Sequence, residues 1–173
     1  MLGIDPGMKI ADFGAGSGAY VMLIARSLEG YGTVYAVDIQ RDLLRRIANE
    51  AARRDLKVVE PVWADLEKPR STKLDDASLD LVLISNLLFQ VDDRSAILAE
   101  AHRILRAGGR LAVIDWSESF GGIGPQKSDV VTKEAALELA GDTGFELQRE
   151  FPAGEHHYGL IFRRSNAPAS IAV

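Results

Sequence analysis

The sequence predicts a doubly wound α/β sheet, because short apolar runs rich in β-forming residues alternate with segments whose apolar residues recur at helical spacing. This alternation occurs twice in the first third of the 173 residues. A later run, Leu79-Asp80-Leu81-Val82-Leu83-Ile84, is nearly all apolar, as in a parallel strand covered on both faces. The right-handed crossovers of such a sheet bring the loops after its strands to one edge, where ligands bind.

The first strand and helix are predicted on either side of a glycine cluster. Lys9–Phe13 is a short apolar run that ends at the glycines. After them, Val21, Ile24, Ala25 and Leu28 have helical spacing. We therefore expect a strand, a tight turn and a helix.

A second strand and helix follow. Thr33–Asp38 is rich in β-forming residues. The helical stripe after it consists of Leu43, Leu44, Ile47, Ala48 and Ala51. Residues 57–63 are a third predicted strand, whereas residues 66–78 are polar and contain Pro69, so we expect a loop with at most a short helix there.

The helix after the central strand has a clear predicted start. Asp92 or Asp93 can cap it, and Gly108-Gly109 is expected to end it before a strand over residues 110–116. Its apolar face comprises Ile97, Leu98, Ala101, Ile104 and Leu105. His102 lies beside this face and is expected to be solvated or at its rim.

The last third predicts a long loop, one helix and two closing strands. Residues 117–128 are rich in glycine and form the loop, and Thr132 can cap a helix over residues 133–140. The closing strands are predicted over residues 145–151 and 157–162. We expect one domain over residues 1–164 and a flexible tail over residues 165–173.

Composition narrows the class of protein. Hydrophobic residues make up 47% and charged residues 26% of the chain, which is typical of a globular protein with a real core. There is no apolar run of about 20 residues and no signal peptide, so we expect a cytoplasmic protein without a membrane span. With no cysteine and only three histidines, no metal site is predicted, and a net charge of −5 disfavours broad adhesion to nucleic acid.

The glycine cluster after the first strand is the first candidate binding element. In Asp12-Phe13-Gly14-Ala15-Gly16-Ser17-Gly18 the glycines alternate, and their missing β-carbons let a ligand approach the backbone. The spacing differs from that of the dinucleotide motif, which disfavours a bound pyrophosphate. Asp12 would repel phosphates but suit a ligand with an ammonium and a sulfonium, the two positive charges of S-adenosylmethionine.

Two further acids follow the next two predicted strands. Asp38 ends the second strand, where a carboxylate can accept hydrogen bonds from both hydroxyls of a ribose, and Ile39 can pack against adenine. Asp65 follows the third strand and can accept a hydrogen bond from the adenine amino group. A turn or a helix cap is the alternative role of each acid.

From about Gly7 to Arg164 the chain resembles the class I S-adenosylmethionine-dependent methyltransferases. The resemblance is strongest to the small-molecule branch that contains the ubiquinone/menaquinone C-methyltransferases. The motifs that carry it are Ile10-Ala11-Asp12-Phe13-Gly14-Ala15-Gly16-Ser17-Gly18, Val37-Asp38-Ile39, Ala64-Asp65-Leu66, Ser85-Asn86-Leu87-Leu88-Phe89 and Leu105-Arg106-Ala107-Gly108-Gly109-Arg110-Leu111. These motifs are specific jointly rather than singly.

The resemblance implies a seven-stranded Rossmann-like sheet of order 3-2-1-4-5-7-6 with strand seven antiparallel. It also implies that Gly14 and Gly16 lie under the methionine part of S-adenosylmethionine, and that Ser85 and Asn86 lie near the transferred methyl group. The cofactor-binding set that we predict comprises Asp12, Gly14, Ala15, Gly16, Gly18, Asp38, Ile39, Ala64, Asp65, Leu66, Ser85 and Asn86.

The catalytic candidates are His156 and His157, which precede the last predicted strand, because a neutral imidazole can take a proton near pH 7. A structural role is the alternative. The acceptor is expected to be a small molecule; RNA, a protein, or a cofactor-binding module without catalysis remain open, as does a homo-oligomer. Small-molecule enzymes of the family that the chain resembles usually have helices before the first strand or after the fifth that cover the substrate, whereas only residues 1–7 precede the first predicted strand here. Three explanations remain open: a large substrate, cover from residues 117–128 with a neighbouring subunit, or a trimmed chain.

Overall fold

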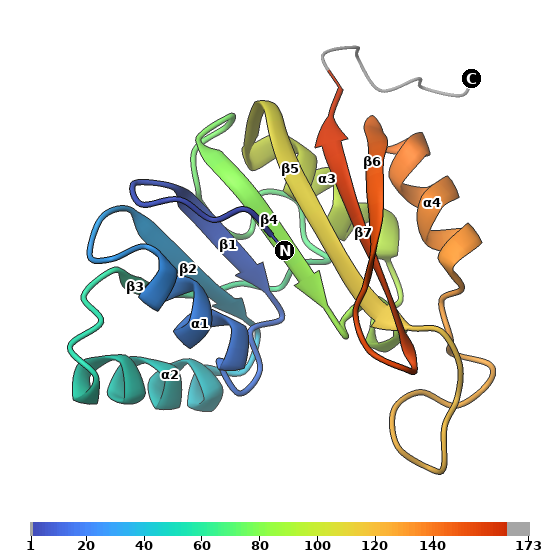
Figure 1. Ribbon diagram of the computed structural model, residues 1–173, viewed down its shortest axis with the longest axis horizontal. Helices are drawn as coiled ribbons and strands as arrows, with labels where there is room; N and C mark the ends of the chain where they lie inside the picture. Colours follow the sequence, from blue (N-terminus) through green and yellow to red (C-terminus); the bar gives the residue numbers. More distant parts are fainter. Residues whose placement is uncertain (1, 166–173) are drawn as a thin grey trace.

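The computed structural model describes residues 2–165 and contains one seven-stranded sheet, with the order β3-β2-β1-β4-β5-β7-β6. β7 runs antiparallel to both of its neighbours, and the other pairs are parallel (Figure 1). The strands are β1 (Lys9–Phe13), β2 (Thr33–Asp38), β3 (Val59–Trp63), β4 (Leu79–Ser85), β5 (Leu105–Trp116), β6 (Phe145–Pro152) and β7 (His157–Arg164). This confirms the predicted fold class and strand order, while residues 166–173 of the expected tail lie outside the described residues.

The helices form a layer on each face of the sheet. They are α1 (Ala19–Ser27), α2 (Arg41–Arg53), α3 (Arg94–Ile104) and α4 (Lys133–Asp142), with a short 3-10 helix η1 (Leu88–Gln90) after β4. α1 and α2 share one hydrophobic cluster with one face of the sheet, and α3 and α4 share a second cluster with the other face. Figure 1 shows α1 and α2 together beside β1 to β3, and α4 beside β6.

Strand position follows from composition. β4 is central, and six of its seven residues are buried, as expected for a strand covered on both faces. β3 is an edge strand with Pro61 at its middle, which fits because proline cannot donate to a sheet ladder. The parallel strands β1, β2, β3, β4 and β5 therefore end at one common edge.

The predicted N-terminal caps of α3 and α4 are confirmed, whereas the predicted C-terminal end of α3 is not. Asp93 accepts from the backbone N–H of Ala96 at 2.9 Å, and Thr132 accepts from that of Ala135 at 3.2 Å, which confirms both caps. The expected end of α3 at Gly108-Gly109 is wrong. Leu105 already has an extended backbone and pairs with Leu79, so the helix ends at Ile104 and the strand begins earlier than predicted.

Residues 66–78 form the predicted loop without a helix, and a buried ion pair fastens it to α3. Arg103 donates from Nε to one carboxylate oxygen of Glu100 at 2.8 Å and from Nη2 to the other at 2.7 Å. Arg103 also donates to the Leu74 carbonyl at 2.8 Å, and the Thr72 hydroxyl donates to Glu100. Such bidentate geometry allows the acid to be buried.

His102 lies at the rim of the apolar face, which is one of the two positions expected. It is half-buried, and its ring meets the edge of the Phe145 ring with centroids 5.4 Å apart. Burial, together with the charge of Arg164, lowers the pKa of His102. Across residues 2–165, every helix is too short or too polar to cross a bilayer.

Candidate functional site

The loop after β1 is wound tightly by backbone hydrogen bonds. The N–H groups of Gly14 and Ala15 both donate to the Val37 carbonyl, at 2.9 and 3.0 Å, and Gly18 donates to the Ala15 carbonyl at 2.8 Å. Gly14, Gly16 and Gly18 all have positive φ, the region in which glycine is favoured. The glycine loop is thus fixed against the end of β2.

Gly18 also lets two helices approach each other. A β-carbon on Gly18 would lie 2.7 Å from Cγ1 of Ile47, which is buried on α2. This residue therefore serves packing between α1 and α2, and it does not line the cavity described below.

Asp38 closes the loop from the side of β2. One carboxylate oxygen accepts from the backbone N–H of Gly16 at 2.9 Å, and the other accepts from that of Gln40 at 2.8 Å. The residue is 6% exposed and lines a cavity. Because each carboxylate oxygen has two lone pairs, both oxygens can still accept from a ligand.

Asp12 lies deeper, at the end of β1. It is 2% exposed, and within residues 2–165 its carboxylate has no hydrogen-bond partner. Burial, and secondarily the charge of Asp38, raises the pKa of Asp12 to about 7. Two neighbouring acids, one of them desolvated and unpaired, create a site that favours a cation.

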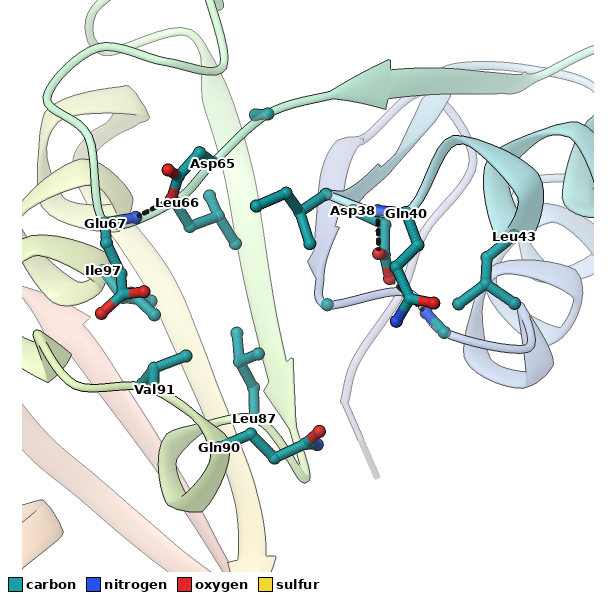
Figure 2. A pocket seen from close by; sticks show the side chains of 14 residues that line it. Asp38, Gln40, Leu43, Asp65, Leu66, Glu67, Leu87, Gln90, Val91 and Ile97 are labelled. Carbon is teal, nitrogen blue, oxygen red and sulfur yellow. Dashed lines mark hydrogen bonds between the residues drawn. The ribbon is translucent and has the colours of Figure 1, made fainter.

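The cavity lies at the carboxyl ends of β1, β2, β3 and β4 and has a volume of about 250 Å³. Its lining comprises Gly14, Gly16, Asp38, Ile39, Gln40, Leu43, Ala64, Asp65, Leu66, Glu67, Leu87, Gln90, Val91 and Ile97. Figure 2 shows Asp38, Gln40 and Leu43 on one side and Asp65, Leu66 and Ile97 on the other. The position coincides with the switch point of the sheet between β1 and β4.

Apolar side chains flank the acids of the cavity. Ile39 is 55% exposed, and its carbonyl accepts from the Trp63 indole N–H at 2.8 Å, which fixes the backbone beside Asp38. Leu66 points into the cavity from the opposite side (Figure 2). An apolar slot next to fixed carboxylates can hold a flat heterocycle with hydroxyl groups.

Two of the acids that line the cavity, Asp65 and Glu67, accept hydrogen bonds from backbone N–H groups. Asp65 accepts from the N–H of Glu67 at 3.2 Å, a local turn contact. Glu67 accepts from the N–H groups of both Asp92 and Asp93, at 2.9 and 2.7 Å, and so joins this loop to the start of α3. Asp65 thus has the turn contact that was its alternative role, and it also lines the cavity.

Ser85 ends β4 and Asn86 follows it, and neither residue lines the cavity. Within the described part of the chain, the Ser85 hydroxyl and the Asn86 side-chain carbonyl are buried without a hydrogen-bond partner. Asn86 has a positive φ of 53°, a conformation that asparagine tolerates. Buried polar atoms without partners are uncommon and mark places where a ligand can supply the missing bond.

The predicted residues divide into three groups. Those that line the cavity are Gly14, Gly16, Asp38, Ile39, Ala64, Asp65 and Leu66. Those that lie on the adjoining segments without lining it are Asp12, Ala15, Gly18, Ser85 and Asn86. His156 and His157 lie farther along the same edge, at the turn between β6 and β7, and do not line the cavity.

Sequence reasoning missed residues that depend on how the segment after β4 folds. Leu87, Gln90 and Val91 line the cavity from this segment, and no spacing rule signals them. The buried Asp115 on β5 anchors it by accepting from the N–H of Leu88 at 3.0 Å and from that of Trp116 at 2.8 Å. Burial raises the pKa of Asp115 to about 6, against the lowering effect of these hydrogen bonds.

The histidines belong to a cluster of rings. His156 Nδ1 lies 2.8 Å from Oε1 of Glu118, and its ring stacks on Phe120 with centroids 3.8 Å apart. His157 packs against Trp116 with centroids 4.2 Å apart. Burial, and then the proximity of His156, lowers the pKa of His157.

The sheet order and the acid-lined cavity at its switch point define an α/β protein whose cavity suits a nucleoside-like ligand with positive charge. Comparison with known proteins is specific. The methyltransferase domain family matches residues 11–113, more than half of the chain. The chain therefore belongs to this methyltransferase domain family, and it is similar in sequence to the UbiE enzymes.

Two curated relatives illustrate the similarity. The ubiquinone/menaquinone biosynthesis C-methyltransferase UbiE of Psychromonas ingrahamii is 30% identical over 115 residues, covering 66% of this chain and 45% of that protein. A demethylmenaquinone methyltransferase of Tropheryma whipplei is 32% identical over 117 residues, covering 68% and 45%. The chain spans less than half the length of these relatives.

A solved structure shares the whole fold. The crystal structure of a SAM-dependent methyltransferase from Aquifex aeolicus superposes with a TM-score of 0.85, at 23% identity, over 94% of this chain and 85% of that one. At 23% sequence identity, this comparison shows similarity of fold alone.

Proposed function

We propose that this chain transfers the methyl group of S-adenosylmethionine to a small-molecule acceptor, with the donor bound in the cavity that Asp38 lines. The observation that carries the proposal is the carboxylate of Asp38, held at the cavity by the N–H groups of Gly16 and Gln40 with lone pairs to spare. A carboxylate in this position suits the two hydroxyls of a ribose.

The charges and surfaces around Asp38 fit the rest of the donor. Asp12 and Asp38 together favour a ligand with positive charge. Ile39 and Leu66 offer apolar surfaces for adenine, and Asp65 an acceptor for its amino group. The Ser85 hydroxyl and the Asn86 carbonyl are buried atoms that need a partner.

When bound, S-adenosylmethionine supplies a methyl group on a sulfonium, an excellent leaving group. The residues of this chain therefore need only hold donor and acceptor close and aligned. The glycine loop, Asp38 and Asp65 do the holding, and the segment anchored by Asp115 closes the cavity from the side of β4. His156 and His157 are the candidates for accepting a proton from the acceptor.

The relatives support a small-molecule acceptor, since the two curated proteins are named as methyltransferases of ubiquinone and menaquinone biosynthesis or of demethylmenaquinone. A planar aromatic or quinone-like acceptor is the specific form of the proposal. The rings of Trp116 and Phe120 at the carboxyl edge are consistent with it.

The proposal is tested with donor carrying a labelled methyl group. The protein is incubated with this donor and with a cell extract divided into small-molecule, RNA and protein fractions. We expect label in the small-molecule fraction, and less of it when Asp38→Ala replaces the wild type at a limiting donor concentration. Label in RNA or protein would refute the acceptor class, and donor binding without transfer to any fraction would indicate a binding module.

A further inference from the structure

Two ring pairs stand side by side at the carboxyl edge of β5, outside the donor cavity. Trp116 is directly opposite His157 in the β5 and β7 ladder, and Phe120 stacks on His156. The Glu118 carboxylate reaches Nδ1 of His156 at 2.8 Å. Three of these residues come from β5 and its following loop, and the two histidines come from β7 and the turn before it.

The loop after β5 is fastened to that turn along its first residues. The Ser117 N–H donates to the His156 carbonyl at 2.9 Å. Farther along, a β-carbon on Gly124 would lie 2.6 Å from the Trp116 ring, so the loop backbone lies directly on the indole. Figure 1 shows the loop and the turn between β6 and β7 at the same end of the sheet.

The cluster adjoins the part of the site where β4 ends. Asp115, immediately before Trp116, holds the Leu88 N–H, and Leu88 follows the cavity residue Leu87. The unpartnered Ser85 ends the neighbouring strand β4, opposite Ile114. Ser117, which donates to the His156 carbonyl, is three residues beyond Ile114, so His156 lies two strands across and about three residues farther along than Ser85, roughly 14 Å away.

We propose that Glu118 is a positioning residue that fixes the His156 ring with its proton on Nδ1, so that Nε2 accepts the proton of an ionisable hydroxyl on the acceptor. This inference rests on the proposed function. It narrows the acceptor to compounds that must lose a proton before or during methylation, and it selects His156 rather than His157 as the base.

The chemistry follows from the two ring nitrogens. A neutral imidazole has one donor and one acceptor nitrogen, and a carboxylate bound to Nδ1 requires the proton there. Nε2 is then the acceptor. The acceptor's O–H bond breaks, its electron pair stays on the acceptor oxygen, and the proton forms the N–H bond at Nε2, from which solvent removes it after transfer.

His157 lacks this arrangement. Its ring packs on Trp116, and among the described residues no carboxylate forms an ion pair with it. The His156 side chain is 22% exposed and its Glu118 partner 58% exposed, so the imidazole remains reachable. An ion pair this exposed contributes little to stability, and variants of Glu118 should therefore fold normally.

The first test reads the tautomer directly and needs neither donor nor acceptor. Protein with ¹⁵N-labelled histidine is studied by NMR at about pH 8.5, well above the ordinary histidine pKa. In the wild type, Nε2 of His156 should have the shift of an unprotonated ring nitrogen. Glu118→Ala should move that shift toward the protonated range. The control Glu155→Ala removes the same charge from the residue next to His156 and should leave it unchanged.

The second test measures transfer to 1,4-naphthalenediol, kept reduced, by mass spectrometry of S-adenosylhomocysteine. His156→Asn should lower kcat/KM about 10²- to 10⁴-fold and abolish the acid limb of its pH profile, as loss of a general base does. Glu118→Ala should lower kcat/KM about ten- to hundredfold. Glu118→Asp should have a smaller effect on kcat/KM than Glu118→Ala, and Glu155→Ala should have the wild-type value.

The outcomes separate this inference from the proposed function. A wild-type Nε2 that carries the proton, or Glu118→Ala with unchanged tautomer and rate, overturns the positioning role. No transfer to the diol by a wild type that binds S-adenosylhomocysteine overturns the acceptor class. Failure of the wild type to bind S-adenosylhomocysteine in calorimetry overturns the proposed function itself.

Discussion

The carboxylate of Asp38 accepts a hydrogen bond from the backbone N–H of Gly16 at 2.9 Å, which joins the end of β2 to the loop after β1. The other carboxylate oxygen of Asp38 accepts from the backbone N–H of Gln40 at 2.8 Å. Together the two hydrogen bonds hold the carboxylate at the cavity, which Gly16, Asp38 and Gln40 all line.

Gly18 and Gly30 form a matched pair for separating backbone strain from packing. Both have φ near +80°, but a β-carbon on Gly18 meets Ile47 at 2.7 Å, whereas one on Gly30 meets nothing within 4 Å. Alanine at either position should lower the free energy of unfolding by about 1–2 kcal/mol from left-handed strain. Gly18→Ala should lower it by about 1–3 kcal/mol more from overpacking. Urea unfolding of both variants measures the difference, and equal losses would contradict the packing role.

Asp12 should make the free protein less stable as pH rises. Its folded pKa of about 7 exceeds the ordinary 3.8, so between these values the folded chain binds more protons than the unfolded one. Stability attributable to Asp12 is therefore lost as pH increases from about 4 to 7. Asp12→Asn should therefore raise the free energy of unfolding more at about pH 8 than at about pH 4, and the difference between the two effects should be on the order of 4 kcal/mol.

Urea unfolding across this pH range measures the effect of Asp12→Asn. Asp42→Asn, an exposed acid on α2, is the control and should track the wild type. Parallel curves for Asp12→Asn and the wild type would show that Asp12 does not titrate in this window.

Binding of a cation beside Asp12 should release protons. The positive charge favours the ionised carboxylate, so S-adenosylmethionine should lower the raised pKa of Asp12. Calorimetry near pH 7 in two buffers of different ionisation enthalpy measures the number released. We expect release with the wild type, less with S-adenosylhomocysteine, which lacks the sulfonium, and none attributable to this residue in Asp12→Asn. Buffer-independent heats for the wild type would contradict the coupling.

Asp115 should act on the cavity through Leu88. Asp115→Ala leaves the buried Leu88 N–H and the Trp116 N–H without their acceptor, and each unpaired group costs about 1–3 kcal/mol of stability. We expect a lower melting temperature and weaker S-adenosylhomocysteine binding, because Leu87 and Gln90 line the cavity from this segment. Asp115→Asn, which keeps one acceptor oxygen, should retain more of both. Full affinity in Asp115→Ala would show that the segment keeps its place without this anchor.

Local features of the fold were predictable from the sequence because they depend on neighbouring residues. Thr132 and Asp93 begin α4 and α3 as expected, since a cap needs only its own side chain and the next turn. The end of α3 was wrong because Leu105 is drawn into the ladder with β4, a tertiary effect. The rim position of His102 was predictable from helical spacing, but its contact with Phe145 was not, because Phe145 comes from a distant strand.

The site was partly predictable. Glycines and acids that follow strands, such as Gly16, Asp38 and Asp65, can be read from order along the chain, because parallel strands end at one edge. Val91 and Ile97 line the cavity from the segment after η1 and from α3, and the contacts of Asp115 with Leu88 and of Glu67 with Asp92 in this region join residues far apart in the sequence. The Glu118 and His156 pair depends on the path of the long loop, which spacing does not determine.

The most direct measurement is a calorimetric titration of S-adenosylhomocysteine into the wild type, Asp38→Ala and Asp42→Ala. Asp38→Ala removes the carboxylate at the junction, whereas Asp42→Ala removes an exposed one four residues along the chain. We predict tight binding to the wild type and Asp42→Ala, and at least about tenfold weaker binding to Asp38→Ala, corresponding to about 1.4 kcal/mol. Equal affinity of all three proteins would contradict the assignment of this cavity to the donor.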